Sequence, residues 1–348
     1  MGRLRSGNDS RAADRPVLVT GGAGFLGVRV VALLRSAGHP VAVVDDGSGA
    51  TSRRLTRFDG DPDVRCHDLD ICDGAAIADV CAAERPWAVV HLAARHFLPT
   101  CEDDVRATRR VNVAGTGRLL SAWRAHAPER FVFASTADVY AASTGPSAER
   151  SSVSPRTAYG RSKLAGEHMV RRAGAAHEVG VVILRPFNLY GPEPTTPHLI
   201  PEICRQLAFG DRLRLGDLAT VRDYLHVDDA ASALVRLLCG TESGTWNLGT
   251  GRGHSGHALV ALVGELSGRV LTADVDPSKM RSNERTHLVA DTARLRRTLR
   301  DFRPTALREG LRHVLDSGQT SSPTRPAGPT PDSSASERVD LGAVAPGA

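Results

Sequence analysis

Three side chains in the middle of the sequence are of types that could move a proton. Thr136 follows an apolar run that predicts a strand, and Tyr159 and Lys163 lie in a stretch with helical periodicity. Residues four apart share a helix face, so the phenol and the ammonium should point the same way. A phenol with its ordinary pKa of about 10 is a poor base at neutral pH, but a nearby ammonium lowers that pKa. The Thr136 hydroxyl could share the proton, although the same spacing also fits a pair on a surface helix.

The scarcity of lysine favours the chemical interpretation of this pair. Lys163 and Lys279 are the only lysines among 44 basic residues, and the chain has only four tyrosines. A sequence that uses arginine nearly everywhere keeps lysine where a compact ammonium is needed. One of these two lysines lies four residues after a tyrosine, and we therefore interpret Tyr159, Lys163 and Thr136 as catalytic.

A glycine cluster near the start of the chain predicts a nucleotide site. Gly21, Gly24 and Gly27 follow the apolar run at residues 17–20 and precede a helical pattern that contains Phe25 and Leu26. Strand, tight turn and helix in this order are typical of a dinucleotide-binding unit. Gly21 permits the turn, Gly24 allows close approach of a pyrophosphate at the helix N-terminus, and Gly27 allows the helix to pack on the strand.

The residue that ends the second predicted strand indicates which dinucleotide binds. Asp45 follows the apolar run at residues 41–44. A carboxylate there can accept hydrogen bonds from both ribose hydroxyls of NAD, and it would repel the 2′-phosphate of NADP. The alternative is an acidic turn residue, but the register with the glycines favours the cofactor role.

Two further strand ends could border the same cofactor. Asp68 and Leu69 follow the third predicted strand, where a carboxylate could accept from the adenine amino group; an N-cap role for Asp68 fits equally well. Leu92, Ala93 and Ala94 end the fourth strand, where small side chains leave room beside a nicotinamide ribose. Close packing of the same residues against the glycine turn is the alternative, and both roles could hold together.

The elements that must position these groups alternate between strand and helix. Strands are predicted at residues 17–20, 41–45, 64–67, 88–92, 131–135 and 179–184, with helices between them, notably 103–126 and 157–172. This alternation predicts an α/β fold of the Rossmann type, a doubly wound parallel sheet covered by helices on both faces. Asn112 lies inside the helix predicted at 103–126 and should bond backbone near the fourth strand.

Beyond Arg185 the pattern becomes irregular and rich in proline, which predicts a smaller α/β domain. We expect a cofactor domain at residues 16–185 plus about 221–249 and a substrate domain at 186–220 and 250–316. Residues 1–15 should form a flexible arm, and the Ser-, Pro- and Gly-rich residues 317–348 a disordered tail.

Composition limits the possible partners and the compartment. The net charge is +5, but arginines are spread along all 348 residues and aromatics are only 4%, so nucleic-acid binding is not expected. No apolar run could span a bilayer, and residues 1–15 lack the core of a secretory signal. The six cysteines have no Cys-x-x-Cys or zinc spacing, so we expect reduced thiols, no metal and a cytoplasmic protein without membrane contact.

Together these segments resemble the extended short-chain dehydrogenase/reductases, in the NAD-dependent epimerase/dehydratase branch that acts on nucleotide sugars. The resemblance runs in order through residues 16–316 and includes the later stretches 184–192, 222–229 and 247–251. It implies NAD as cofactor and a nucleotide-diphosphate sugar as substrate. Fold analogy also implies a homodimer that pairs the helices at 103–126 and 157–172.

The resemblance implies a role for each matching residue. Tyr159 would be the base and acid, with Lys163 its partner and Thr136 the third member. Asn188 would contact the substrate diphosphate, and Arg222 and Arg281 would bind nucleotide phosphates, although Arg222 could instead pair with a nearby aspartate.

Arg95 and His96 follow the alanine pair where family members contact substrate. His96 could be an extra acid or base, or only a polar wall of the pocket, which is the commoner role of an isolated histidine.

A departure from the family pattern points to the reaction. Dehydratases of this branch resemble one another in a Thr-Asp-Glu run, where this chain has Thr136-Ala137-Asp138. Ala137 cannot protonate a departing hydroxyl, so we expect an epimerase, acting at C4 through a transient 4-keto sugar. The alternatives are a 4-ketoreductase or dehydrogenase, a nucleotide-uronate decarboxylase, and a catalytically silent NAD-binding protein.

Overall fold

A computed structural model describes residues 15–319, except 50–51, 127–128, 194–197 and 281–284. The flexible arm and the disordered tail predicted from the sequence lie almost wholly outside these described residues.

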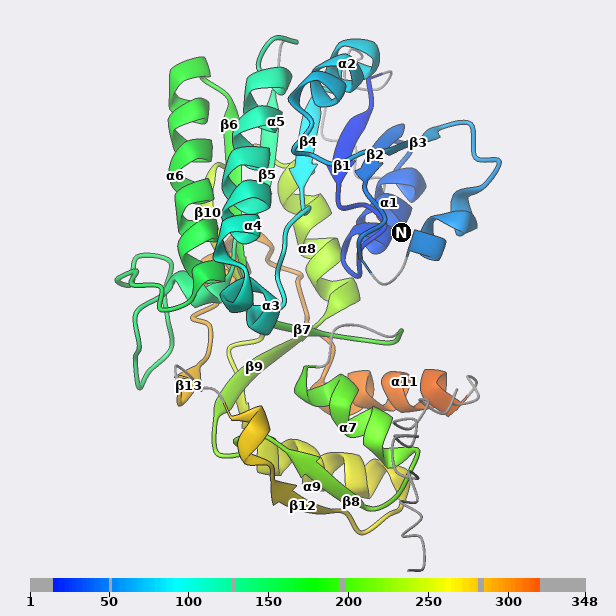
Figure 1. The fold of residues 1–348 in the computed structure, drawn as a ribbon, viewed down its shortest axis with the longest axis vertical. Helices are drawn as coiled ribbons and strands as arrows, with labels where there is room; N and C mark the ends of the chain where they lie inside the picture. Colours follow the sequence, from blue (N-terminus) through cyan, green and yellow to red (C-terminus); the bar gives the residue numbers. More distant parts are fainter. Residues whose placement is uncertain (1–14, 50–51, 127–128, 194–197, 281–284, 320–348) are drawn as a thin grey trace, which may run out of the picture.

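A seven-stranded parallel sheet forms the upper part of the molecule (Figure 1). Its order is β10-β6-β5-β4-β1-β2-β3, and all neighbouring pairs are parallel. The strands are β1 Val17–Thr20, β2 Val41–Asp45, β3 Val64–Asp68, β4 Ala88–His91, β5 Arg130–Ala134, β6 Gly180–Pro186 and β10 Gly244–Leu248. The predicted fold class is confirmed by this parallel topology. The central strands are short apolar runs buried on both faces, as a parallel sheet requires.

Helices cover both faces of this sheet. The helices α1 Gly27–Ser36 and α8 Val227–Cys239 pack on one face; α2 Gly74–Glu84, α5 Thr116–Trp123 and α6 Ala158–His177 pack on the other. Side chains of one strand alternate between the two cores, since Val17 and Val19 face α1 while Leu18 faces α2. The carboxyl ends of the strands are thereby fixed at one edge.

The helix predicted at residues 103–126 is not continuous. The chain forms α3 Leu98–Asp103, α4 Val105–Arg109, a π-helical turn at Arg110–Gly115, and then α5. Asn112 explains the extra residue in this turn: its amide accepts from Arg95 N at 2.8 Å and donates to Arg95 O at 2.9 Å and to Ser162 Oγ at 2.9 Å. The expected bonding of Asn112 to backbone beyond the fourth strand is confirmed, and the π turn brings its amide inward.

The lower part of the molecule has its own core. One sheet contains β7 Asn188–Tyr190, β9 Val221–His226, β11 Gly253–Ser255 and β13 His287–Leu288, and β8 Arg212–Leu215 pairs with β12 Thr272–Val275. The helices α7 Leu199–Leu207, α9 Gly256–Ser267 and α11 Leu307–Gln319 enclose a third cluster of buried apolar side chains. The helix α10 Ala293–Thr298 instead packs on β10 of the large sheet. None of the described helices is long and apolar enough to cross a bilayer.

Candidate active site

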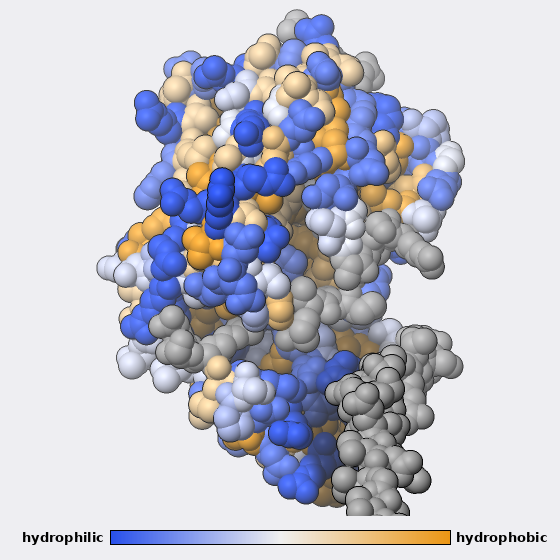
Figure 2. Space-filling view, in the orientation of Figure 1, coloured by the Kyte–Doolittle hydropathy of each residue, from blue (hydrophilic) through white to orange (hydrophobic). Residues whose placement is uncertain are grey.

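A cavity of about 1650 Å³ lies between the carboxyl edge of the large sheet and the lower part of the molecule. Figure 2 shows a hollow on this face, with hydrophobic residues in its depth. The cavity is lined from both parts, by the glycine turn and the ends of β4 and β5 on one side and by β7, α7 and β9 on the other. The strand order reverses beside β1, which is where ligands bind in doubly wound sheets.

The three glycines of the turn meet different surroundings. Gly21 has a φ of +73°, and a Cβ there would lie 2.6 Å from Ala93 N; a Cβ at Gly27 would lie 2.1 Å from Gly21 O. These two positions are closed by the protein's own backbone. A Cβ at Gly24 would meet only Gly21 O, at 3.1 Å, and Gly24 lines the cavity. The absence of a side chain at Gly24 therefore fits a ligand that approaches the backbone closely.

The start of α1 also fits a pyrophosphate. No side chain caps this helix at Leu26, and its first turn contains no acidic residue. Phe25 and Leu26 both line the cavity beside Gly24. A helix N-terminus that no side chain caps offers backbone N–H groups and the positive end of the helix dipole to an anion.

The carboxylate of Asp45 lies at the cavity wall, where it accepts hydrogen bonds from Ala23 N at 2.9 Å and Gly47 N at 3.0 Å. Burial raises its pKa, against the lowering effect of these two bonds. Asp68, at the end of β3, is exposed and does not line the cavity, whereas Leu69 and Asp70 do.

Leu92, Ala93 and Ala94 line the cavity directly after β4. They also pack against the glycine turn, as the contact of Gly21 with Ala93 shows, so the two roles weighed for them are compatible. His91, just before them, is fully buried; its Nδ1 is 2.6 Å from Thr20 Oγ1 and its Nε2 is 2.9 Å from Thr116 Oγ1. Burial, with a contribution from the Lys163 charge, lowers its pKa to about 3, so the ring is neutral and structural.

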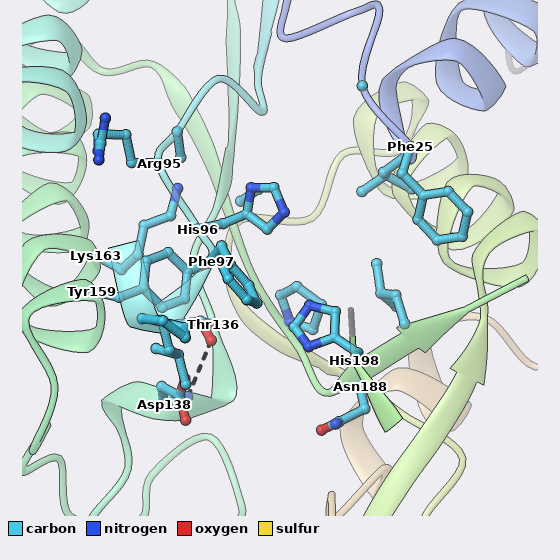
Figure 3. Close-up of a pocket in the computed structure, with 18 of the residues that line it drawn as sticks. Phe25, Arg95, His96, Phe97, Thr136, Asp138, Tyr159, Lys163, Asn188 and His198 are labelled. Carbon is cyan, nitrogen blue, oxygen red and sulfur yellow. Dashed lines mark hydrogen bonds between the residues drawn. The ribbon is translucent and has the colours of Figure 1, made fainter. Parts of the chain in front are cut away.

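Tyr159 and Lys163 lie on one face of α6 and both line the cavity, with Thr136 beside them (Figure 3). Thr157 caps the helix through Gly160 N at 2.9 Å, which fixes where its first turn begins. Thr136 accepts from Asp138 N at 3.2 Å and caps the short helix η3 Ala137–Val139. The structure thus brings the three side chains of the predicted triad to one wall.

The pKa values of this pair differ from the expectation. Burial raises the pKa of Tyr159, the charge of Asp138 adds to the rise, and a hydrogen bond with Thr136 lowers it only in part. Burial also lowers the pKa of Lys163, to about 7. The protein alone therefore does not lower the phenol pKa, because desolvation penalises the charged form of both groups.

Lys163 is 3% exposed, and its Nζ lies 4.9 Å from the centre of the Phe133 ring. No described residue accepts a hydrogen bond from this Nζ. The ammonium opens onto the cavity, where an acceptor group of a bound ligand could take its hydrogen bonds. This donor, the bare Gly24 and the Asp45 acceptor together fit the ribose and pyrophosphate groups of NAD.

His96 and Arg95 continue the wall after Ala94. His96 projects into the cavity in Figure 3, and burial lowers its pKa, so its ring is neutral. Arg95 is held by its backbone bonds to Asn112 and by donating to Thr100 O at 3.3 Å. The ring of Phe97 meets His198 edge-on at 6.2 Å, which closes the lower side of the cavity.

Asn188 and Arg222 line the cavity from β7 and β9, and Asn188 is in register with Tyr224. Arg222 donates to Val221 O at 2.9 Å. Arg281 lies outside the described residues. Arg285, which we did not predict, is 7% exposed and donates to Ala137 O at 3.1 Å and Asp138 O at 2.7 Å, so it holds the segment after Thr136.

A buried ion pair behind the triad was also missed. Glu167, fully buried on α6, accepts from Arg185 Nε at 2.8 Å and Nη2 at 2.7 Å, and from Ser135 Oγ at 2.6 Å. Ser135 directly precedes Thr136, and Glu167 lies one turn after Lys163. Arg185 in the Leu-Arg-Pro stretch could have indicated a buried charge, but nothing in the sequence shows which acidic residue would pair with it. The described residues contain no cluster of three metal-ligating side chains.

Comparison with known proteins identifies the family to which the chain is similar. The model of the NAD dependent epimerase/dehydratase family matches residues 17–249. The chain is 34% identical over 313 residues to a UDP-glucose 4-epimerase of Azospirillum brasilense, covering 84% of this chain and 88% of the relative. It is 30% identical over 310 residues to a GDP-6-deoxy-D-mannose reductase of Pseudomonas aeruginosa, covering 86% and 95%. The structure of a Thermus thermophilus UDP-glucose 4-epimerase complexed with NAD superposes with a TM-score of 0.79 at 29% identity, covering 88% and 100%.

Proposed function

The chain belongs to the NAD-dependent epimerase/dehydratase family, and we propose that it epimerises a nucleotide-activated sugar at C4 with NAD as its cofactor. The observation that carries the proposal is the common wall formed by Tyr159, Lys163 and Thr136, which faces the same cavity as the glycine turn. Nucleotide-diphosphate sugars are the proposed substrates, since this is the class named for the 4-epimerase relatives.

The chain's own residues bind and orient the reactants. Gly24, the start of α1 and Asp45 would hold NAD, and Lys163 would donate to its ribose. Asn188 and Arg222 would contact the diphosphate of the substrate from the opposite side of the cavity, with Arg281 a further phosphate ligand. When bound, NAD accepts a hydride from the sugar and later returns it, so turnover leaves no net reduced nicotinamide.

Tyr159 would take the proton from the C4 hydroxyl. It would return the proton after the 4-keto sugar has rotated in the cavity to present its opposite face to the nicotinamide. Thr136, which lowers the pKa of the phenol, would share that proton. The high pKa of Tyr159 in the protein alone means that the phenolate forms only when more positive charge enters the cavity. The oxidised nicotinamide would supply such a charge, to which Lys163 adds its own when it is protonated.

The segment after Thr136 argues against dehydration. Ala137 is 2% exposed and carries no acid, while Asp138 lines the cavity. A 4-ketoreductase is the second candidate, because the Pseudomonas aeruginosa relative is a reductase of a nucleotide sugar. Decarboxylation of a nucleotide uronate and a catalytically silent NAD-binding role are less favoured than either.

A panel of nucleotide sugars incubated with the protein and NAD, followed by NMR of the products, tests the proposal. We expect a C4 stereoisomer with no accumulating NADH; steady NADH formation would point to the dehydrogenase. The variant Tyr159→Phe should lower kcat by about 10²- to 10⁴-fold while binding UDP-glucose with unchanged affinity. Thr136→Ser keeps the hydroxyl and should retain most activity. Unchanged turnover in Tyr159→Phe would contradict the mechanism.

The oligomeric state and compartment belong to the same proposal. We infer a cytoplasmic homodimer that pairs α5 and α6, which lie side by side on one face in Figure 1. Sedimentation equilibrium at micromolar concentration would give the mass, and a monomer would contradict the dimer.

A further inference from the structure

A second cavity, of about 690 Å³, lies between the β10–β11 loop, α9 and the chain that leads into α11. In Figure 1 the helices α9 and α11 lie together in the lower part of the molecule. Tyr224 lines both this cavity and the first one, so it belongs to their common wall. Nothing in the proposed reaction uses this second cavity.

Arginine dominates the lining of the second cavity. Four of the 13 described lining residues are arginines, namely Arg252, Arg296, Arg303 and Arg308, and none is Asp or Glu. The whole chain has 44 basic residues in 348, so arginine is denser in this lining than in the chain as a whole. The gathering of positive charge at one hollow is therefore a specific feature of this site.

Three of these charges have no carboxylate partner among the described residues. Arg296 donates to Thr250 O at 3.1 Å, and Arg303 donates to the carbonyls of Arg300 at 2.8 Å and Phe302 at 3.1 Å. No described residue accepts from the Arg252 guanidinium. Only Arg308 forms an ion pair, with Glu265. The nearby acid Asp301 forms its ion pair with Arg236, although the charge of Arg303 also helps to lower the pKa of Asp301.

Two acidic side chains, one buried and one partly exposed, hold the two sides of the cavity in place. Asp223 is fully buried and accepts from Thr250 N at 2.8 Å, Thr250 Oγ1 at 2.6 Å and Gly251 N at 2.8 Å, which fixes the loop that carries Arg252. On the other side, Asp229 accepts from Thr305 N at 2.7 Å, close to Arg303 in the chain. The guanidinium groups thus project from a backbone that is already ordered.

Apolar side chains complete the lining and suggest more than a bare anion. Phe302, 6% exposed, and Leu262 lie in the wall with Leu307. Planar guanidinium groups bind phosphate oxygens in pairs, and a cavity of this size holds a molecule as large as a nucleotide. We propose that the second cavity binds a phosphorylated small molecule, its phosphate held by Arg252, Arg296 and Arg303.

Calorimetric titration of the full chain with NAD, at low ionic strength, tests this site. Inorganic pyrophosphate and uridine diphosphate are titrated separately, each in the presence of excess UDP-glucose to fill the first cavity. We expect binding that persists under these conditions and that weakens about tenfold or more in Arg252→Ala and in Arg303→Ala. Tighter binding of uridine diphosphate than of pyrophosphate would assign the apolar wall to a base, and equal affinities would assign the site to phosphate itself.

The matched control is Arg297→Ala, which removes an exposed arginine from the same helix as Arg296 but outside the cavity. It should leave the affinity unchanged. Absence of binding, its loss when UDP-glucose is present, or equal weakening by Arg297→Ala would overturn the proposal, because the charge would then be diffuse or the ligand would occupy the first cavity. Since the readout is direct binding, the result does not depend on epimerase activity.

Discussion

Replacing Glu167 with glutamine should destabilise the protein by about 3–5 kcal/mol, the usual effect of breaking a buried ion pair. Glu167 is fully buried and Arg185 is 3% exposed, so neither charge can be hydrated when the other is lost. The two bonds from Arg185, at 2.7 and 2.8 Å, are also of the charge-assisted kind. In Glu167→Gln the guanidinium keeps its charge without a counterion, and the introduced amide would direct an N–H group toward either Arg185 or Ser135.

The pH dependence of this contribution follows from the pKa of Glu167. Burial works to raise that pKa, but the hydrogen bonds and charge of Arg185 outweigh burial and hold it below its ordinary value of 4.5. A carboxylate with a depressed folded-state pKa stabilises the protein fully above its unfolded pKa. The difference between wild type and Glu167→Gln should therefore persist at neutral pH and shrink as the pH falls below about 4.5.

Urea unfolding followed by tryptophan fluorescence measures the effect, since Trp123 and Trp246 are buried in the two cores of the sheet. Arg171 provides the matched control: it donates to Glu167 at 2.8 Å, but its side chain is 42% exposed. Arg171→Ala should cost no more than about 1 kcal/mol. Glu167→Asp keeps the charge and gives an intermediate variant if Glu167→Gln fails to fold. A loss in Glu167→Gln no larger than in Arg171→Ala would refute the reasoning.

Two further pairs of measurements separate binding from folding. Gly27→Ala should destabilise by about 3 kcal/mol or more in thermal unfolding, because its Cβ meets backbone at 2.1 Å. Gly24→Ala, whose Cβ meets Gly21 O at 3.1 Å, should lose less stability but should lose NAD affinity in a fluorescence titration. Equal destabilisation by both variants would contradict the proposed pyrophosphate site at Gly24. Lys163→Met should raise the Tm of the cofactor-free protein while abolishing turnover. The folded pKa of Lys163, about 7, lies below its unfolded value of 10.5, so the unfavourable burial of its charge is greatest at and below pH 7. The gain in Tm should fall as the pH rises from 7 towards 10.5, and a pH-independent Tm difference would contradict this account.

The parallel sheet could be predicted because its central strands, such as β1 and β2, are short runs of apolar, mostly β-branched residues that end at a polar residue. Residues 17–20 and 41–45 were predicted with the observed bounds of β1 and β2. The facing of Tyr159 and Lys163 could also be predicted, since helical spacing alone determines it. These features depend on residues close together in sequence.

The features that the sequence did not reveal depend on residues far apart. Glu167 and Arg185 are separated by 18 residues, and Arg285 reaches carbonyls 147 or more residues away. The π turn at residues 110–115 was missed for the same reason, because Asn112 bonds to Arg95 and Ser162, which lie on other elements. The raised pKa of Tyr159 was missed because desolvation is a property of the folded site rather than of helical spacing.

The contrast between the cavity wall and the layer behind it indicates where the protein is incomplete. Behind the wall, the polar groups of His91, Asn112 and Glu167 all have hydrogen-bond partners within the protein. At the wall, Lys163 is buried without an acceptor among the described residues, and Tyr159 is held neutral. A satisfied polar network holds the wall in place, so its open groups await a partner from the cavity. A ligand that brings an acceptor to Lys163 and positive charge to Tyr159 would complete both groups, and an oxidised nicotinamide nucleotide carries both.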